Sequence, residues 1–389
     1  ADAGASWFPE GDAVELDAAR RDVGLVAVVE HAGSAAATNA GIRTEWSTTE
    51  YRLESASGLS ETLDARTPVV TAFAEQLRRL GPAVDLLVGG SFAKAAGDLY
   101  ASPRAQLRWR PAAPDTHSAG YARSRQYAQS LRNPESVAGN LFPPDLFVGA
   151  GAPEVPVARS DLGVAAIEYR PWAGGRVALE AYGRDFEGML LPALAGGDPF
   201  ARGELLSGSG TAKGLSLEAG LATSRVGVLL SYGLQRVRIT HADSSYVPGH
   251  GASHLLEGGV VLFPAATLSI RVGAAAILGR RSTALAGGFE WESCNLLDRG
   301  CEFVGSPVTS GAPGGTELPA YFRLDLGVRQ HWHLHVGGRD ATLGLFGTLT
   351  NAFGRRNLLA LARDPATGEL VPIEMRPRAP LVVGLDWRF

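Results

Sequence analysis

The sequence lacks a long hydrophobic run. Residues 23–29 are among its longest apolar stretches, whereas a transmembrane helix needs about 20 apolar residues in a row. A helical membrane span is therefore excluded. A transmembrane β-barrel remains possible, because a barrel places its apolar residues at alternate positions and leaves no continuous run.

The sequence also lacks an excess of basic residues and any familiar catalytic signature. Its formal net charge is -4 at pH 7, which argues against nucleic acid as a partner. It has no G-x-S-x-G or H-E-x-x-H motif, so it predicts a protein that is not an enzyme and needs no cofactor. Residues 208–214 (GSGTAKG) superficially resemble a phosphate-binding loop, but the spacing differs and a strand rather than a helix is expected to follow.

A signal peptide is missing at the start of the chain. Residues 1–6 (ADAGAS) contain neither a basic segment nor an apolar core. We therefore expect a mature protein or a piece of one.

The chain is rich in glycine and in apolar residues at alternate positions. Its 389 residues include 49 Gly and 23 Pro, and 45% of them are hydrophobic. No sustained helical periodicity accompanies this composition, so a large all-β protein is favoured.

The last residues show the alternation most clearly. Apolar side chains occupy one face of the strand expected there, at Leu381, Val383, Leu385, Trp387 and Phe389. Roughly ten residues suffice for a tilted strand to cross a bilayer core. The alternative is an ordinary final strand of a soluble β-sandwich.

The same reading along the chain predicts about fifteen strands, joined alternately by short turns and by longer loops. The second of them places Ala40, Ile42 and Trp46 on one face and charged residues on the other. The expected strands cover residues 19–29, 40–46, 69–78, 84–92, 103–109, 117–127, 164–169, 176–186, 215–221, 226–234, 256–262, 268–278, 322–336, 343–353 and 381–389.

This sorting of connections predicts an up-and-down transmembrane barrel with antiparallel strands. A soluble sandwich has no reason to place its long loops on one side, whereas outer-membrane barrels have short periplasmic turns and long extracellular loops. Bacterial single-chain barrels normally close with an even number of strands. The odd number here indicates that part of the barrel is missing.

Four stretches resemble the carboxy-terminal part of the barrel of TonB-dependent outer-membrane receptors. They are residues 102–109 (SPRAQLRW), 208–217 (GSGTAKGLSL), 351–357 (NAFGRRN) and the terminal 381–389 (LVVGLDWRF). Their order and spacing carry the likeness, which extends over essentially all 389 residues. We therefore expect one partial barrel domain over residues 1–389, without a plug.

The resemblance implies a place and a function. The family's barrel has 22 strands around a plugged lumen, so fifteen strands would be its strands 8 to 22. It implies a bacterial outer-membrane location in contact with lipid, and a tag at Leu385, Trp387 and Phe389 that the barrel assembly machinery reads. It also implies TonB-coupled uptake of a scarce solute, such as a metal chelate, a cobalamin-like molecule or an oligosaccharide. In this uptake hypothesis TonB would contact the receptor only through the plug, which this chain lacks. The alternative is a passive pore or a structural barrel that works without TonB.

Three further groups of residues are candidates for a role. Cys294 and Cys301 fall in the longest extracellular loop, where oxidising conditions permit a structural disulfide. On one lumen-facing row, His331, His333 and His335 stand at about 7 Å spacing and form a weak candidate metal site, the alternative being a solvated or plug-facing row.

A second lumen-facing group has an open interpretation too. Glu180, Tyr182 and Arg184 share one face of a strand, opposite apolar Val177 and Leu179. They are candidate substrate contacts near the mouth of the barrel. The alternative is a charged wall that hydrogen-bonds to the plug or to water.

Overall fold

The structure is a computed structural model that describes most of the chain. The described residues are 2–7, 14–55, 60–112, 114–130, 147–150, 155–192, 205–241, 244–249, 251–286, 309–310, 312, 314–364, 367–375 and 380–388. In this part of the chain, no helix has both the length and the apolar character needed to cross a membrane.

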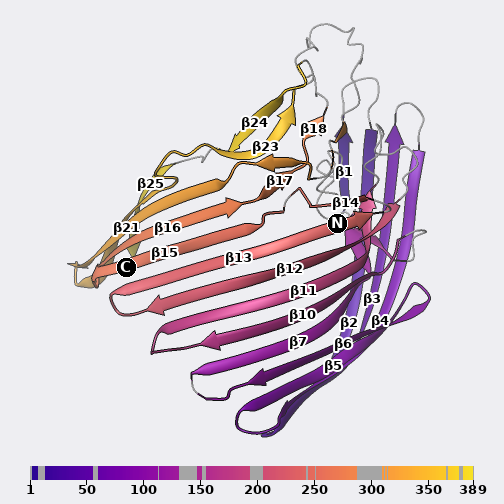
Figure 1. Cartoon of the computed structure of the whole chain (residues 1–389), viewed down its shortest axis with the longest axis horizontal. Helices are drawn as coiled ribbons and strands as arrows, with labels where there is room; N and C mark the ends of the chain where they lie inside the picture. Colours follow the sequence, from indigo (N-terminus) through magenta and orange to yellow (C-terminus); the bar gives the residue numbers. More distant parts are fainter. Residues whose placement is uncertain are drawn as a thin grey trace.

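Fifteen long strands follow one another in chain order, each antiparallel to its neighbours (Figure 1). They confirm the predicted all-β meander and correspond one to one with the fifteen expected strands. Their bounds are β2 (Val14–Ala32), β3 (Ala36–Ser55), β4 (Ser60–Arg79), β5 (Val84–Ala95), β6 (Asp98–Trp109), β7 (Asp115–Gln126), β10 (Ala158–Tyr169), β11 (Gly175–Pro192), β12 (Leu205–Ala222), β13 (Val226–His241), β15 (His254–Ala265), β16 (Leu268–Leu278), β21 (Tyr321–Val336), β22 (Arg339–Leu349) and β25 (Leu381–Arg388).

The two edges of this sheet do not meet in the described part of the chain. The short strand β1 (Asp2–Trp7) pairs with β2 at one edge. At the other edge, β25 pairs with β22. The described wall is therefore an open, curved sheet.

The connections are sorted as the sequence predicts, with one exception. We call the side of the short connections, such as 80–83 and 110–114, the turn end, and the opposite side the loop end. A loop was expected between residues 92 and 103, and that expectation was wrong: β5 and β6 continue to a tight turn at Ala96 and Gly97. Both residues have positive φ, 50° and 89°, as a type I′ hairpin turn requires.

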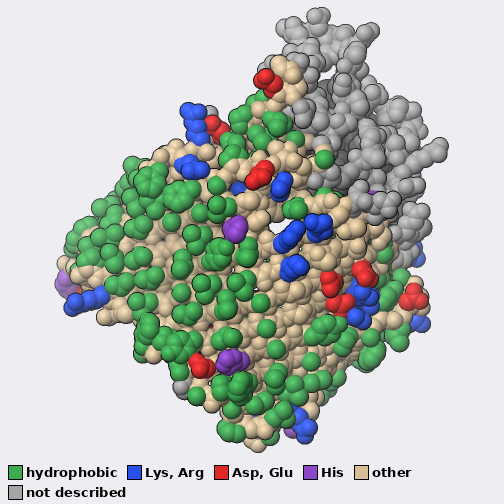
Figure 2. Space-filling model, in the orientation of Figure 1, with side chains coloured by type: hydrophobic (Ala, Val, Ile, Leu, Met, Phe, Trp, Pro, Cys, Tyr) green, Lys and Arg blue, Asp and Glu red, His purple; other side chains and the backbone are tan. Residues whose placement is uncertain are grey.

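The sheet has one apolar face, which we call the outer face. Cross-strand pairs such as Val23 with Trp46 and Ile167 with Leu179 lie on it. These are large side chains that remain exposed, Val23 at 62% and Leu179 at 40%. Figure 2 shows hydrophobic side chains over most of this face, with charged side chains gathered toward the loop end.

The opposite face, which we call the inner face, carries the polar side chains. In β3, Arg43, Glu45 and Ser47 alternate with the outer residues Ile42 and Trp46, as predicted. Charged pairs also cross between strands on this face. The outer face of the sheet therefore suits an apolar environment, and the inner face suits a polar one.

Aromatic rings on the inner face cover glycines of the neighbouring strand. In each case the ring and the glycine are direct cross-strand partners, and a Cβ on the glycine would collide with the ring. An aromatic ring over a glycine fills the gap that the missing side chain leaves, and it helps to fix strand register. The four pairs are Phe73 over Gly41, Phe186 over Gly210, Tyr182 over Gly214 and Phe346 over Gly384.

Short strands lie at the loop end and, in part, beyond it. Some pair among themselves, and the β23–β24 hairpin projects beyond the sheet at the top of Figure 1. These strands are β8 (Ala128–Ser130), β9 (Phe147–Gly149), β14 (Ser244–Tyr246), β17 (Arg280–Ser282), β18 (Leu285–Ala286), β19 (Thr309–Ser310), β20 (Thr316–Leu318), β23 (Asn357–Arg363) and β24 (Leu370–Met375).

Candidate functional site

The inner face near the turn end holds networks of ion pairs. Arg176 of β11 bridges Glu168 of β10 and Glu218 of β12, with nitrogen–oxygen distances of 3.1 Å and 2.7 Å. These pairs join three consecutive strands across the sheet. They follow from the strand alternation, which places all three side chains on the inner face.

A similar network lies at the carboxy-terminal edge. Asp386 of β25 accepts from Arg329 of β21 at 3.0 Å and pairs with Arg388 at 3.0 Å. The inner wall is thus charged but largely neutralised by its own partners. Such a lining supports water and polar solutes rather than an apolar ligand.

A hairpin from the connection between β7 and β10 lies across the inner face at the loop end. Its strands β8 and β9 pair through Ala128 to Ser130 and Phe147 to Gly149. The Thr49 hydroxyl of β3 donates to the Phe147 carbonyl at 3.5 Å, and the Arg20 guanidinium of β2 lies 5.1 Å from the Phe147 ring centroid. The hairpin therefore reaches strands far from its own.

The other side of the hairpin is anchored by a buried amide. Gln129 is 6% exposed, and its Nε2 donates to the carbonyls of Pro156 and Gly188, each at 2.8 Å. Gly188 belongs to β11, so the hairpin spans from β11 to β3. This span shows that the inner face is concave and that the hairpin narrows the opening of the concave space at the loop end.

A small apolar core lies beneath this hairpin on the inner face. Val69, Ala93 and Ala95 are buried there, and Tyr100 and Tyr127 pack against them. Burial raises the pKa of the Tyr127 phenol, an effect that the charge of Arg125 opposes. The sequence predicted only an extended loop after Tyr127, and nothing in its pattern signalled this inward packing.

The predicted substrate contacts on β11 do lie on the inner face. Arg184 Nε donates to Ser160 Oγ of β10 at 2.5 Å. The Tyr182 ring lies over Gly214, where an added Cβ would come within 2.6 Å of it. Glu180 has no ion-pair or hydrogen-bond partner in the described part of the chain, and it lines a polar hollow of about 260 Å³ with Arg108 and Glu218. Of the three side chains, Glu180 is thus the one most available to contact a substrate.

The three histidines also share the inner face, but each has a local neighbour. His335 Nδ1 lies 2.8 Å from Asp340 Oδ1, and His333 Nδ1 lies 3.3 Å from the Thr342 hydroxyl. His331 is opposite Gly344 of β22. Over the ranges that the structure describes, no three acidic, cysteine or histidine side chains are grouped to hold a metal ion.

The remaining candidate residues divide between the outer face and the undescribed ranges. Leu385 is 73% exposed and Trp387 is 43% exposed, and both lie on the predicted apolar face of β25. Cys294, Cys301 and Phe389 lie outside the described residues. The disulfide and the assembly tag at Leu385, Trp387 and Phe389 therefore remain predictions.

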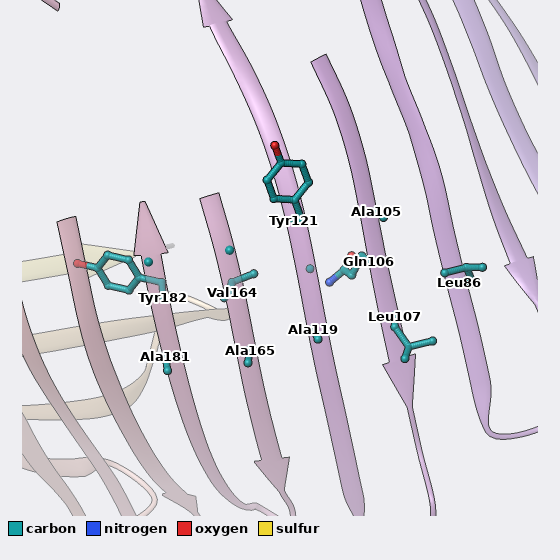
Figure 3. Close-up of a pocket in the computed structure, with 13 residues that line it drawn as sticks. Leu86, Ala105, Gln106, Leu107, Ala119, Tyr121, Val164, Ala165, Ala181 and Tyr182 are labelled. Carbon is teal, nitrogen blue, oxygen red and sulfur yellow. The ribbon is translucent and has the colours of Figure 1, made fainter. Parts of the chain in front are cut away.

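A shallow groove of about 630 Å³ lies on the outer face, away from the polar lining (Figure 3). Two cross-strand rows of β6, β7, β10 and β11 form it, and most of their side chains are small. Tyr121 closes the groove toward the loop end, where its hydroxyl donates to Asp161 Oδ1 at 2.5 Å. The rows are Ala105, Tyr121, Gly163 and Gly183, then Leu107, Ala119, Ala165 and Ala181.

Comparisons with known proteins show likeness in fold alone. No family model and no curated protein matches the sequence. Solved structures do match. The siderophore receptor PirA from Pseudomonas aeruginosa aligns over 97% of this chain and 58% of its own, with 12% identity and a TM-score of 0.54.

Two further outer-membrane proteins align in the same way. The ferric yersiniabactin uptake receptor FyuA from Yersinia pestis covers 99% of this chain and 56% of its own, with 12% identity and a TM-score of 0.60. The outer membrane transporter YddB from Escherichia coli covers 97% and 54%, with 9% identity and a TM-score of 0.52. The chain thus spans little more than half the length of these proteins. Its fold is that of the β-barrel wall of outer-membrane uptake receptors, as the sequence resemblance implied.

Proposed function

We propose that the chain forms part of the barrel wall of a bacterial outer-membrane receptor. In this proposal the receptor takes up a scarce solute, with a metal chelate as the first candidate, and TonB supplies the work through a plug domain. The observation that carries the proposal is the fifteen-strand wall itself. It has an apolar outer face and a charged inner face, and it aligns over nearly its whole length with a siderophore receptor and a ferric yersiniabactin uptake receptor.

The inner face supports this role rather than a catalytic one. Its charged side chains are held in pairs such as Arg176 with Glu218, which form a wall rather than an activated nucleophile. The mouth is narrowed by the β8–β9 hairpin, and Glu180 and Arg108 line an open polar hollow. In this proposal they contact the solute or the plug.

Uptake by living cells tests the proposal. Cells that lack the full-length gene, with and without TonB, are supplied with radiolabelled ferric chelates, cobalamin and oligosaccharides. We expect accumulation of at least one solute to require both the gene and TonB. Accumulation that needs the gene but continues without TonB would instead identify a passive pore.

A further inference from the structure

Three cations gather on the outer face where the apolar rows of β12 and β13 end. Lys213 of β12 is the direct cross-strand partner of Arg236 of β13, and Arg238 lies two residues farther along, opposite Thr211. All three side chains are exposed. Direct cross-strand partners have Cβ atoms about 5 Å apart, and like charges in that arrangement repel.

No carboxylate in the described part of the chain neutralises these cations. Within the described ranges, Lys213, Arg236 and Arg238 form no ion pair and no side-chain hydrogen bond. The nearest acid in the register is Asp185, which lies opposite Thr211. We call Lys213, Arg236 and Arg238 the cation triad.

A neighbouring group of charges at the same level of the outer face is arranged differently. There Asp161 pairs with Arg123 at 2.7 Å and with Arg159 at 3.0 Å, and Arg159 also pairs with Glu187 at 2.8 Å. Those arginines have acidic partners, whereas no described residue forms an ion pair with the cation triad. Both groups lie toward the loop end of the face in Figure 2.

The position of the triad relative to the apolar rows is equally specific. On the turn side of Lys213, the outer residues of β12 run Leu215, Leu217, Ala219 and Leu221. From Leu221 up to Lys213 the strand is about 26 Å long, which at a tilt near 40° is about 20 Å of height, close to the apolar band of about 25 Å on an outer-membrane barrel. The cations therefore stand where lipid headgroups would meet the wall.

We propose that the cation triad binds the phosphate groups of an anionic lipid of the outer leaflet. Guanidinium groups present paired N–H donors that match phosphate oxygens, and the Thr211 hydroxyl lies on the same face. The lipid's acyl chains lie along Leu215 and Leu234, which a soluble anion would leave uncovered. This inference rests on the proposed function, because it requires the loop end to face the outer leaflet.

Binding of lipid A, a glycolipid with two phosphates, tests the inference. The full-length receptor that contains this chain is folded in detergent, and bound copies of lipid A are counted by native mass spectrometry as the lipid is added. The triple variant Lys213→Gln, Arg236→Gln, Arg238→Gln removes the triad. We expect it to bind lipid A about 10- to 100-fold more weakly, since each of the three cations contributes a similar part of the attraction to the anionic lipid.

Matched variants separate the triad from total charge. Lys94→Gln, Arg225→Gln, Arg339→Gln makes the same change in net charge at three exposed sites that lie apart from one another, and it should bind like the parent chain. Arg236→Lys, Arg238→Lys keeps the charge and should retain most of the binding. Lipid A without its phosphates should bind weakly to every variant.

Two results would overturn the inference. One is a triple variant that binds lipid A as tightly as the parent chain, and the other is a control triple weakened to the same extent. If the triple variant does not fold, the three single substitutions give the same comparison in graded form. Insertion into bilayers is scored separately with the full-length receptor: a full-length receptor that never inserts contradicts the proposed function, whereas an inserted receptor whose triple variant binds lipid A unaltered contradicts this inference alone.

Discussion

The two faces of the same strands obey opposite rules. On β25, Leu385 is 73% exposed, while its neighbour Asp386 is held by Arg329 and Arg388 at 3.0 Å each. A protein dissolved in water would cover the leucine and leave the aspartate to solvent. The difference indicates that hydrocarbon surrounds the outer face and that water fills the inner one.

The largest expected effect comes from placing a charge on the wrong face. Leu217 is an outer residue near the middle of the apolar row of β12, and Ser216 beside it is an inner residue opposite Glu180. We expect Leu217→Arg to lower the free energy of unfolding in lipid vesicles by about 2–4 kcal/mol. Ser216→Arg gains Glu180 as a neighbour and should cost less than about 1 kcal/mol.

Urea unfolding followed by tryptophan fluorescence measures both variants. Equal losses at the two adjacent positions would contradict the distinction between the faces. A loss confined to Leu217→Arg would sharpen it, because the two sites share one strand and differ only in the side to which they point.

An intermediate effect is expected from glycines on the two faces. On the inner face, a Cβ at Gly41 would overlap the Ala27 carbonyl oxygen and the Phe73 ring, whereas at Gly183 on the outer face nothing lies within 4 Å. Gly41→Ala should therefore destabilise the barrel by about 1–3 kcal/mol through overpacking. Gly183→Ala should change its stability by less than about 1 kcal/mol.

The same unfolding assay checks this pair, with the circular dichroism of each folded variant as the control for strand content. Should Gly183→Ala prove the more destabilising, the close packing of rings over inner glycines would not be what stabilises the wall.

The smallest effect is expected from a single inner ion pair. The Arg176 side chain is 45% exposed, so water screens its attraction to Glu168 and Glu218. Arg176→Gln should cost about 0.5–1 kcal/mol at low salt. In 1 M salt, where the screening length is about 3 Å, most of that difference should vanish.

Arg225→Gln provides the comparison for this variant. Arg225 lies in the turn between β12 and β13 and has no ion-pair partner in the described ranges, so its substitution should be neutral at both salt concentrations. A loss for Arg176→Gln that persists in high salt would show a role in packing rather than in charge pairing.

The sequence predicted the long strands well because their pattern is local. Alternation in a stretch such as 214–221 identifies a strand and its two faces without knowledge of its partners. The tight turn at Ala96 and Gly97 was missed because the strands on both sides continue through residues with little alternation. The hairpin of β5 and β6 is visible only once their register is known.

The mouth of the barrel could not be predicted, because distant segments determine it. The inward hairpin depends on Gln129 reaching the Gly188 carbonyl 59 residues away. Strands β17 to β20 are two or three residues long and exist only through pairing with other loops. The Tyr182 ring over Gly214 likewise requires the cross-strand register, so its packing role was not apparent beside its predicted contact with substrate.

One measurement tests the central claim most directly. Single cysteines at residues 214–220 of β12, in a Cys294→Ser, Cys301→Ser background, are spin-labelled in bilayers and exposed to oxygen, which partitions into lipid, or to a water-soluble nickel complex. We expect residues 215, 217 and 219 to respond to oxygen, and residues 214, 216, 218 and 220 to respond to nickel. Uniform access to nickel along this stretch, or no alternation with a period of two, would contradict the account.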